Sequence, residues 1–130
     1  MTIERRNNPR INLSGPVSMK VADEAFTAKL MNITPQGVQV ELSQSGMNLL
    51  SSHRPADGSW PVTHIEFGQT IKDPAVETGI DGELVFSRRI SQKIFIAGFR
   101  FIISDVLKQE SVRLLVQSLL RKQEDKRAKK

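Results

Sequence analysis

Alternation of apolar and polar residues over most of the chain predicts β-strands. The clearest cases are PVSMKVA at residues 16–22 and GVQVELS at residues 37–43, where every second side chain is apolar. This is the pattern of a strand with one buried face. Less regular apolar runs predict four more strands, at residues 26–33, 62–68, 82–90 and 93–104.

After residue 104 the apolar period changes to that of an α-helix. The positions that recur at helical spacing are Leu107, Val112, Leu114, Leu115, Val116 and Leu119. Ser104 or Asp105 is available as the N-cap, and basic residues concentrate at the far end, where the helix dipole favours cations. These features predict one amphipathic helix over residues 105–122 that packs on the sheet.

The least regular region lies between the third and fourth predicted strands. It reads SQSGMNLLSSHRPADGSWP, residues 43–61, and predicts a long loop with at most one helical turn. The region holds the only tryptophan, Trp60, next to a proline. A single tryptophan in such a loop is expected to cover the core rather than to bind a ligand.

Together these segments predict a mainly all-β fold, a six-stranded antiparallel closed β-barrel with a C-terminal α-helix. Closure is favoured because it removes the exposed edges that an open sheet presents. The predicted organisation is a flexible arginine-rich arm (residues 1–13), a barrel (14–104), the C-terminal helix (105–122) and a basic disordered tail (123–130).

Composition fits one cytoplasmic domain. The chain has 130 residues, of which 38% are hydrophobic and 25% charged, as in ordinary folded proteins. It has no apolar run near the roughly 18 residues of a membrane span, so no membrane insertion is expected. There is no cysteine, and two histidines, His53 and His64, make a poor set of metal ligands. We therefore expect no metal site.

The formal charge of +5 is concentrated at the two ends of the chain. Residues 1–10 carry three arginines and one glutamate, and residues 121–130 carry six basic and two acidic side chains, whereas residues 11–120 have a net charge of −1. A protein that grips DNA or RNA usually spreads its cations over a groove or face. No DNA or RNA partner is therefore expected.

The N-terminal cations lie in the short stretch RRNNPR. Arg5, Arg6 and Arg10 fall within six positions, and Pro9 biases Asn8 toward extended geometry. The stretch is therefore not expected to form a helix with a basic stripe. It is interpreted either as a flexible arm whose guanidiniums close on a ligand or as a disordered terminus that charge keeps soluble.

The second feature is the turn NITPQG, residues 32–37, between the second and third predicted strands. Pro35 suits the first central position of a type I turn and Gly37 suits its last position. Asn32 and Thr34 can bond nearby backbone through their side chains. Taken alone, the segment is a common hairpin turn.

In this order and spacing, the two features resemble the PilZ domain, a bacterial receptor module for the second messenger cyclic di-GMP. The RxxxR arm ends at Arg10, and an [DN]x[SA]xxG-like turn begins 22 residues later at Asn32. The family usually has Ser or Ala where this chain has Thr34. The segments GVQVEL and AGFRF and the final helix extend the resemblance over nearly the whole chain.

The chemistry of cyclic di-GMP suits these residues. A guanidinium matches the adjacent O6 and N7 acceptors of guanine with two parallel bonds, and it also pairs with phosphate or stacks on a purine. We therefore expect Arg6 and Arg10 to contact phosphate and guanine. Asn32, Thr34 and Gly37 are expected to form the wall that reads a base edge.

Arg5 extends what the resemblance implies. A basic residue at this place in PilZ-like proteins accompanies an intercalated ligand dimer, so we expect two cyclic di-GMP molecules per chain. Arg88 and Arg89 have two open interpretations. They are a further phosphate contact or simply the charged end of a hairpin.

The resemblance implies a non-enzymatic bacterial cyclic di-GMP receptor. Ligand binding would order the arm over the barrel and alter the interaction with an unidentified protein partner in motility, exopolysaccharide or biofilm control. The chain is expected to be a monomer or weak dimer. Two alternatives stay open, a PilZ-like adaptor in pilus or polysaccharide machinery that binds no nucleotide, and a small barrel that binds single-stranded nucleic acid.

Overall fold

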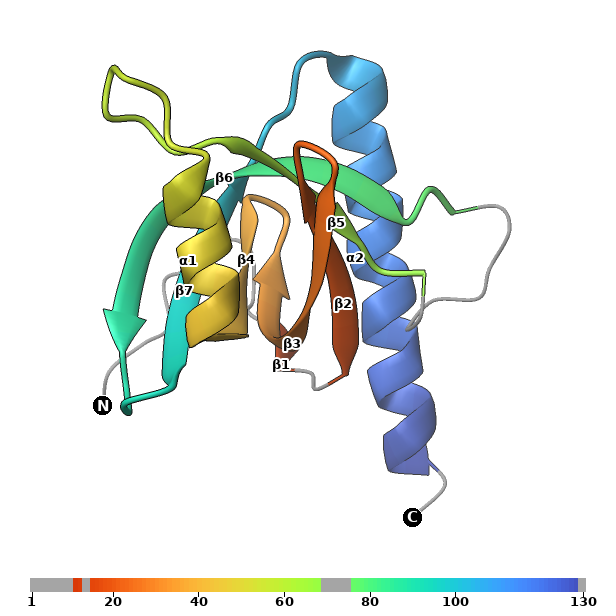
Figure 1. Cartoon of the computed structure of the whole chain (residues 1–130). Helices are drawn as coiled ribbons and strands as arrows, with labels where there is room; N and C mark the ends of the chain where they lie inside the picture. The colour runs from red at the N-terminus through yellow and green to blue at the C-terminus, as the bar shows by residue number, and fades with distance from the viewer. Residues whose placement is uncertain (1–10, 13–14, 69–75, 129–130) are drawn as a thin grey trace, which may run out of the picture.

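The computed structural model describes residues 11–12, 15–68 and 76–128 of the chain. Figure 1 shows strands that curve around a common core, with the second helix running along one side. The elements in chain order are β1 (Ile11–Asn12), β2 (Pro16–Val21), β3 (Glu24–Thr34), β4 (Gly37–Ser43), α1 (Gln44–Ser52), β5 (Val62–Glu66), β6 (Gly79–Arg89), β7 (Ile94–Phe101) and α2 (Val106–Ala128).

Strands β2 to β7 form a closed antiparallel barrel. They follow the order β3-β2-β5-β6-β7-β4, and β4 pairs with β3 to close the circle. The two-residue strand β1 is added beside β3. The predicted six-stranded closed barrel with a C-terminal helix is therefore confirmed. The arm was predicted to extend to residue 13, but Ile11–Asn12 belongs to the sheet.

The apolar positions of the strands line the inside of the barrel. Both clearest alternations are confirmed, since Val17, Met19, Val21, Val38, Val40 and Leu42 are all buried. Strand β7 adds Ala97, Phe99 and Phe101. Burial of this continuous apolar set is the main favourable term that stabilises the fold. The outer face is then left for polar side chains and for a binding site.

The predicted loop at residues 43–61 is wrong in its first half, where the chain forms helix α1. Ser43 caps the helix, because its hydroxyl accepts a hydrogen bond from the Gly46 amide at 3.2 Å. Met47 and Leu50 are buried against the core. Trp60 packs on the core as expected, and the Arg54 guanidinium lies 4.2 Å from the centre of its ring.

Helix α2 begins as predicted but ends later. Asp105 is the N-cap, because its carboxylate accepts a hydrogen bond from the Lys108 amide at 2.8 Å. The helix continues to Ala128, past the predicted end at residue 122, so residues 123–128 are helical rather than a disordered tail. The sequence KQEDKRA explains the extension, because most of these residues have high helix propensity.

One side of α2 belongs to the core of the barrel. Val112, Leu115 and Leu119 are each at most 2% exposed. The start of the helix is also tied to the segment before β6, because Lys108 and Ser111 both donate to the Glu77 carboxylate. The hydrogen bond from Lys108, together with its charge, lowers the pKa of Glu77.

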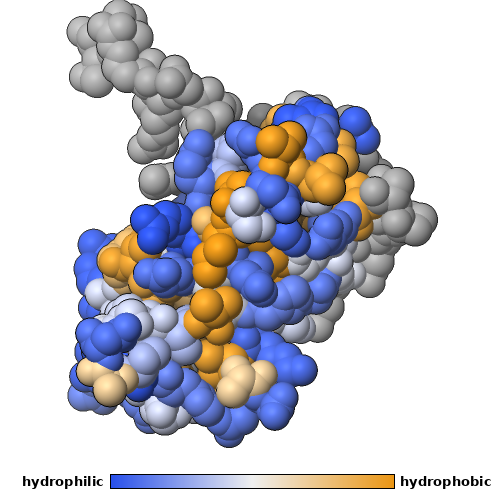
Figure 2. Space-filling model, turned by 90° about the horizontal axis from the view of Figure 1, so that it is seen from above, coloured by the Kyte–Doolittle hydropathy of each residue, from blue (hydrophilic) through white to orange (hydrophobic). Residues whose placement is uncertain are grey.

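The first turn of α2 faces solvent. Leu107, which was expected on the apolar face of the helix, is 79% exposed, and its neighbour Val106 is 77% exposed. Figure 2 looks down on the end of the molecule where α2 begins and shows apolar residues at its surface. No helix in the described part of the chain is long and apolar enough to span a membrane.

Because one part of α2 is buried and another is exposed, the same substitution to alanine should affect the free energy of unfolding very differently at the two places. Leu115→Ala should lower the free energy of unfolding by about 2–5 kcal/mol, because it leaves a cavity in the core. Leu107→Ala should change it by less than about 0.5 kcal/mol, because the side chain is exposed. Urea denaturation followed by circular dichroism measures both values. Equal losses would show that α2 does not dock through this face.

Candidate functional site

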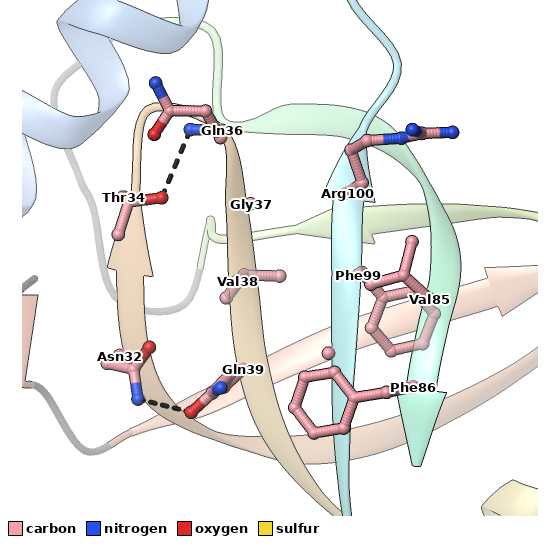
Figure 3. Close-up of a pocket in the computed structure, with 11 residues that line it drawn as sticks. Asn32, Thr34, Gln36, Gly37, Val38, Gln39, Val85, Phe86, Phe99 and Arg100 are labelled. Atoms are coloured by element: carbon pink, nitrogen blue, oxygen red, sulfur yellow. Dashed lines mark hydrogen bonds between the residues drawn. The ribbon is translucent and has the colours of Figure 1, made fainter. Parts of the chain in front are cut away.

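A pocket of about 220 Å³ opens on the outer face of the barrel, where β3, β4, β6 and β7 lie side by side (Figure 3). Its lining residues are Asn32, Thr34, Gln36, Gly37, Val38, Gln39, Val85, Phe86, Gly98, Phe99 and Arg100. The pocket thus brings together the three turn residues that the sequence singled out. The other three predicted site residues, Arg5, Arg6 and Arg10, lie outside the described residues.

The centre of the pocket is a row of side chains that crosses four strands. Asn32 of β3 is the cross-strand partner of Gln39 of β4, Gln39 is the partner of Gly98 of β7, and Gly98 is the partner of Phe86 of β6. Polar amides therefore stand at one end of the row and an aromatic ring at the other. The glycine between them leaves space for the aromatic ring to lie over β7.

A β-bulge in β3 explains why Asn32 faces outward. Leu30 and Asn32 are two residues apart, so a regular strand would point both the same way. Leu30 is fully buried, however, and its partner Val40 lies next to Gln39, the partner of Asn32. Met31 is thus the extra residue, and the bulge turns Asn32 into the pocket.

A second bulge, in β6, does the same for Phe86. Leu84 pairs with Phe99 and Phe86 pairs with the adjacent Gly98, so Val85 is the extra residue. Leu84 points into the core, whereas Phe86 is 44% exposed. The Phe86 ring covers Gly98 closely, since a Cβ atom on that glycine would lie less than 3.0 Å from ring carbons.

The turn at the end of the pocket is held by backbone and side-chain bonds. The Thr34 hydroxyl accepts a hydrogen bond from the Gln36 amide at 3.2 Å, and the Phe101 amide donates to the Gln36 carbonyl at 2.9 Å. Gly37 lies so close to β7 that a Cβ atom there would be less than 3.0 Å from the Phe99 carbonyl oxygen. Barrel packing therefore requires this glycine.

The described lining of the pocket is nearly neutral. Among these residues only Arg100 carries a charge, and its guanidinium lies 3.8 Å from the Glu83 carboxylate. Asn32 donates to the Gln39 side-chain oxygen at 2.8 Å. The site offers amide and hydroxyl groups and an aromatic surface, and an anionic ligand would need further cations.

Strand β1 brings the end of the arm to this pocket. Asn12 is the cross-strand partner of Asn32, and Ile11 is the partner of Ile33. Arg10 directly precedes Ile11 in the chain. The arm therefore joins the barrel beside the turn residues.

Sequence reasoning missed several pocket residues. Alternation in GVQVELS places Gln39 outward but does not show what it faces. Strict alternation in GELVFSRRI would point Phe86 inward with Leu84. Because the pattern gives no sign of the bulge, it does not predict that Phe86 faces the pocket. Neither Arg88 nor Arg89 lines the pocket. Arg100 was missed as well, because the sequence of β7 predicted a strand but no binding residue within it.

Arg89 has contacts of its own at the end of β6. It donates to the Gln44 side-chain oxygen at 2.7 Å and lies 5.0 Å from the centre of the Phe95 ring. The histidines form pairs with carboxylates, His53 with Glu24 at 2.6 Å and His64 with Asp81 at 2.9 Å. Within the described residues, no group of three or more such side chains is placed to hold a metal ion.

Comparison with known proteins gives one family. The model of the PilZ domain matches residues 4–120. A search of curated proteins gives no match.

Solved structures share the fold at low sequence identity. The PilZ domain of YcgR from Escherichia coli with cyclic di-GMP has 15% identity and a TM-score of 0.63, and the alignment covers 98% of this chain and 100% of that one. The PilZ domain of CeSA from a cellulose-synthesizing bacterium has 19% identity and a TM-score of 0.54, with 84% and 96% covered.

Longer proteins contain the same fold as a part. PlzA of Borreliella burgdorferi in complex with cyclic di-GMP has 11% identity and a TM-score of 0.55. The alignment covers 86% of this chain but only 52% of PlzA. This chain therefore spans about half the length of that protein.

The close approach of Gly37 to β7 predicts a structural effect of a small substitution. Gly37→Ala should lower the free energy of unfolding by about 1–3 kcal/mol, because the backbone of β7 must shift. Thr34→Ala, which removes a single exposed hydrogen bond, should cost less than about 1 kcal/mol. Thermal unfolding compares the two variants. A Gly37→Ala protein as stable as the unsubstituted chain would contradict this packing.

Proposed function

The chain belongs to the PilZ domain family, and we propose that it is a receptor for cyclic di-GMP. The observation that carries this proposal is that Asn32, Thr34 and Gly37 line one preformed pocket on the outside of the barrel. Relatives of the same fold, YcgR and PlzA, have been solved in complex with this nucleotide. We propose a binding module rather than an enzyme.

The arm supplies the charge that the pocket lacks. Cyclic di-GMP carries two phosphates, and the only cation in the described lining, Arg100, is already near Glu83. Arg5, Arg6 and Arg10 provide three guanidiniums that suit phosphate and guanine. Six extended residues reach at most about 22 Å, so even Arg5 stays within reach of Ile33, the partner of Ile11.

Phe86 adds a surface on which a base can stack. Its ring reaches from β6 over β7 (Figure 3), and it is 44% exposed although it lies in the pocket. A purine placed between this ring and the amides of Asn32 and Gln39 would have one stacked face and one polar edge. We propose that Phe86 contributes this stacking.

The arm links binding of the nucleotide to the interaction with a protein partner. Ordering a free segment costs conformational entropy, and a ligand that bridges arm and barrel offsets this cost with charge-assisted hydrogen bonds. The ordered arm presents a new surface to a protein partner, with an effect on motility, exopolysaccharide or biofilm formation. We propose two ligand molecules per chain, with Arg5 against the second.

The arginines of the arm give the first test of this proposal. Arg6→Ala and Arg10→Ala should each weaken binding of cyclic di-GMP by about 5- to 150-fold, the loss of one bidentate contact worth about 1–3 kcal/mol. Isothermal titration calorimetry measures the dissociation constant and the stoichiometry.

Arg113→Ala is the matched control. Arg113 is an exposed arginine of α2 that pairs with Glu110 of the same helix, so its removal should leave the affinity unchanged. Absence of any heat when the unsubstituted chain is titrated at tens of micromolar nucleotide would refute the receptor function. An equal loss in all three variants would point to a general effect of charge.

Phe86 gives a second test that does not involve charge. Phe86→Leu keeps an apolar cover over Gly98 but removes the aromatic face, so affinity should fall by about 5- to 150-fold. Phe86→Trp should keep or raise the affinity. If Phe86→Leu binds as tightly as the unsubstituted chain, the base does not stack on this ring.

A further inference from the structure

Arg100 is the charged residue of the described pocket lining, and it stands beside the Phe86 ring. It follows Gly98 by two residues on β7, with the buried Phe99 between them, so both positions face the outside of the barrel. Two residues of a strand span about 7 Å. Because the Phe86 ring covers Gly98, a cation lies next to the proposed stacking surface.

A second row of cross-strand partners runs beside the row that holds Gly98. Thr34 of β3 pairs with Gly37 of β4, and Gly37 pairs with Arg100 of β7. Arg100 pairs in turn with Glu83 of β6. The neighbour of Arg100 on one side therefore has no side chain, and the neighbour on the other side has a carboxylate. The guanidinium can lie over Gly37 inside the pocket or over β6 against Glu83.

In the structure Arg100 takes the position against Glu83. Its side chain extends toward β6, away from Thr34 and Gly37 (Figure 3), and its guanidinium lies 3.8 Å from the Glu83 carboxylate. This distance is longer than a hydrogen bond, so the pair is held by charge alone. The two side chains are 66% and 39% exposed, and water weakens such a pair. A ligand with stronger bonds to offer can replace it.

We propose that Arg100 is a further ligand-binding residue, which exchanges Glu83 for a phosphate of the nucleotide, and that Glu83 opposes binding by holding it. The proposal rests on the proposed function, since it concerns the same ligand. Each base of a cyclic dinucleotide is one ribose away from a phosphate. A base stacked on Phe86 thus brings a phosphate near Arg100, and a guanidinium binds phosphate oxygens with two parallel charge-assisted hydrogen bonds.

The exchange predicts opposite effects for the two partners of the ion pair. Arg100→Gln removes the bonds to the phosphate, so the dissociation constant of cyclic di-GMP should rise by about 5- to 50-fold. Glu83→Gln frees the guanidinium, so the dissociation constant should fall by about 2- to 5-fold. Calorimetry measures both values. A pair that only stabilised the barrel would give no gain in affinity when Glu83 is replaced.

The ion pair between Arg113 and Glu110 is the matched control. Both residues are exposed on α2, which contributes no residue to the described pocket lining. Arg113→Gln and Glu110→Gln make the same changes of charge as the two pocket variants. Each should alter the dissociation constant by less than about 1.5-fold at about 0.15 M salt, where exposed charges more than about 8 Å apart are largely screened.

The double variant Arg100→Gln/Glu83→Gln separates the exchange from direct repulsion of the ligand by Glu83. If Glu83 acts by holding Arg100, its replacement has nothing to release once the arginine is gone. Glu83→Gln should then change the dissociation constant by less than about 1.5-fold in the Arg100→Gln background. Dependence of one substitution on the other is the signature of a direct coupling between the two side chains.

The outcomes separate this inference from the function on which it rests. If the unsubstituted chain gives no heat with cyclic di-GMP, the proposed function fails, and this inference fails with it. If the chain binds the nucleotide but Arg100→Gln binds it as tightly, the inference alone is wrong. An equal gain from Glu83→Gln with and without Arg100, or no gain at all, overturns the exchange.

Discussion

A closed barrel constrains its own binding site, because each strand has one face in the core and can offer only alternate residues to the outside. In β3 this rule would point Asn32 into the core with Leu30. In β6 it would point Phe86 into the core with Leu84. One extra residue in each strand breaks the alternation. The two bulges keep the core apolar and still put an amide and an aromatic ring on the outer face.

Asn32 and Phe86 then lie on the outer face at the two ends of a row of residues that crosses four strands. Gly98 lies in the middle of this row, next to Phe86, and any larger residue there would collide with the ring. Gly37 has a different role, because it lets the turn approach the backbone of β7. Apart from Arg100, the described lining of the pocket is thus built from neutral groups, and in the proposed function the arm supplies the counter-charge for the ligand.

Sequence patterns predicted the barrel well because successive side chains of a strand point to opposite faces. A strand with one face in the core therefore alternates apolar and polar residues. The three turn residues that the sequence singled out, Asn32, Thr34 and Gly37, lie together in one pocket, and their role in binding stays a prediction. Helix α1 was missed because Ser and Gly favour loops, while its stability comes from a cap and from Met47 and Leu50 in the core. Local propensity contains no information about such tertiary contacts.

Bulges were the other limit of prediction. A strand with an inserted residue keeps its apolar composition, so nothing in GELVFSRRI indicated that Phe86 would leave the face of Leu84. Leu107 is a comparable case, because its helical spacing is correct but the apolar side chains of α2 are buried in the core only from Val112 onward.

The most direct measurement is a titration of the ¹⁵N-labelled chain with cyclic di-GMP, followed by amide chemical shifts. The site described above predicts the largest changes at residues 32–39 and at Gly98, together with changes at residues 5–10. Changes centred instead on the first half of β3, around Thr27 and Lys29, would contradict it. So would changes in the pocket with none in the arm, because the arginines would then not hold the ligand.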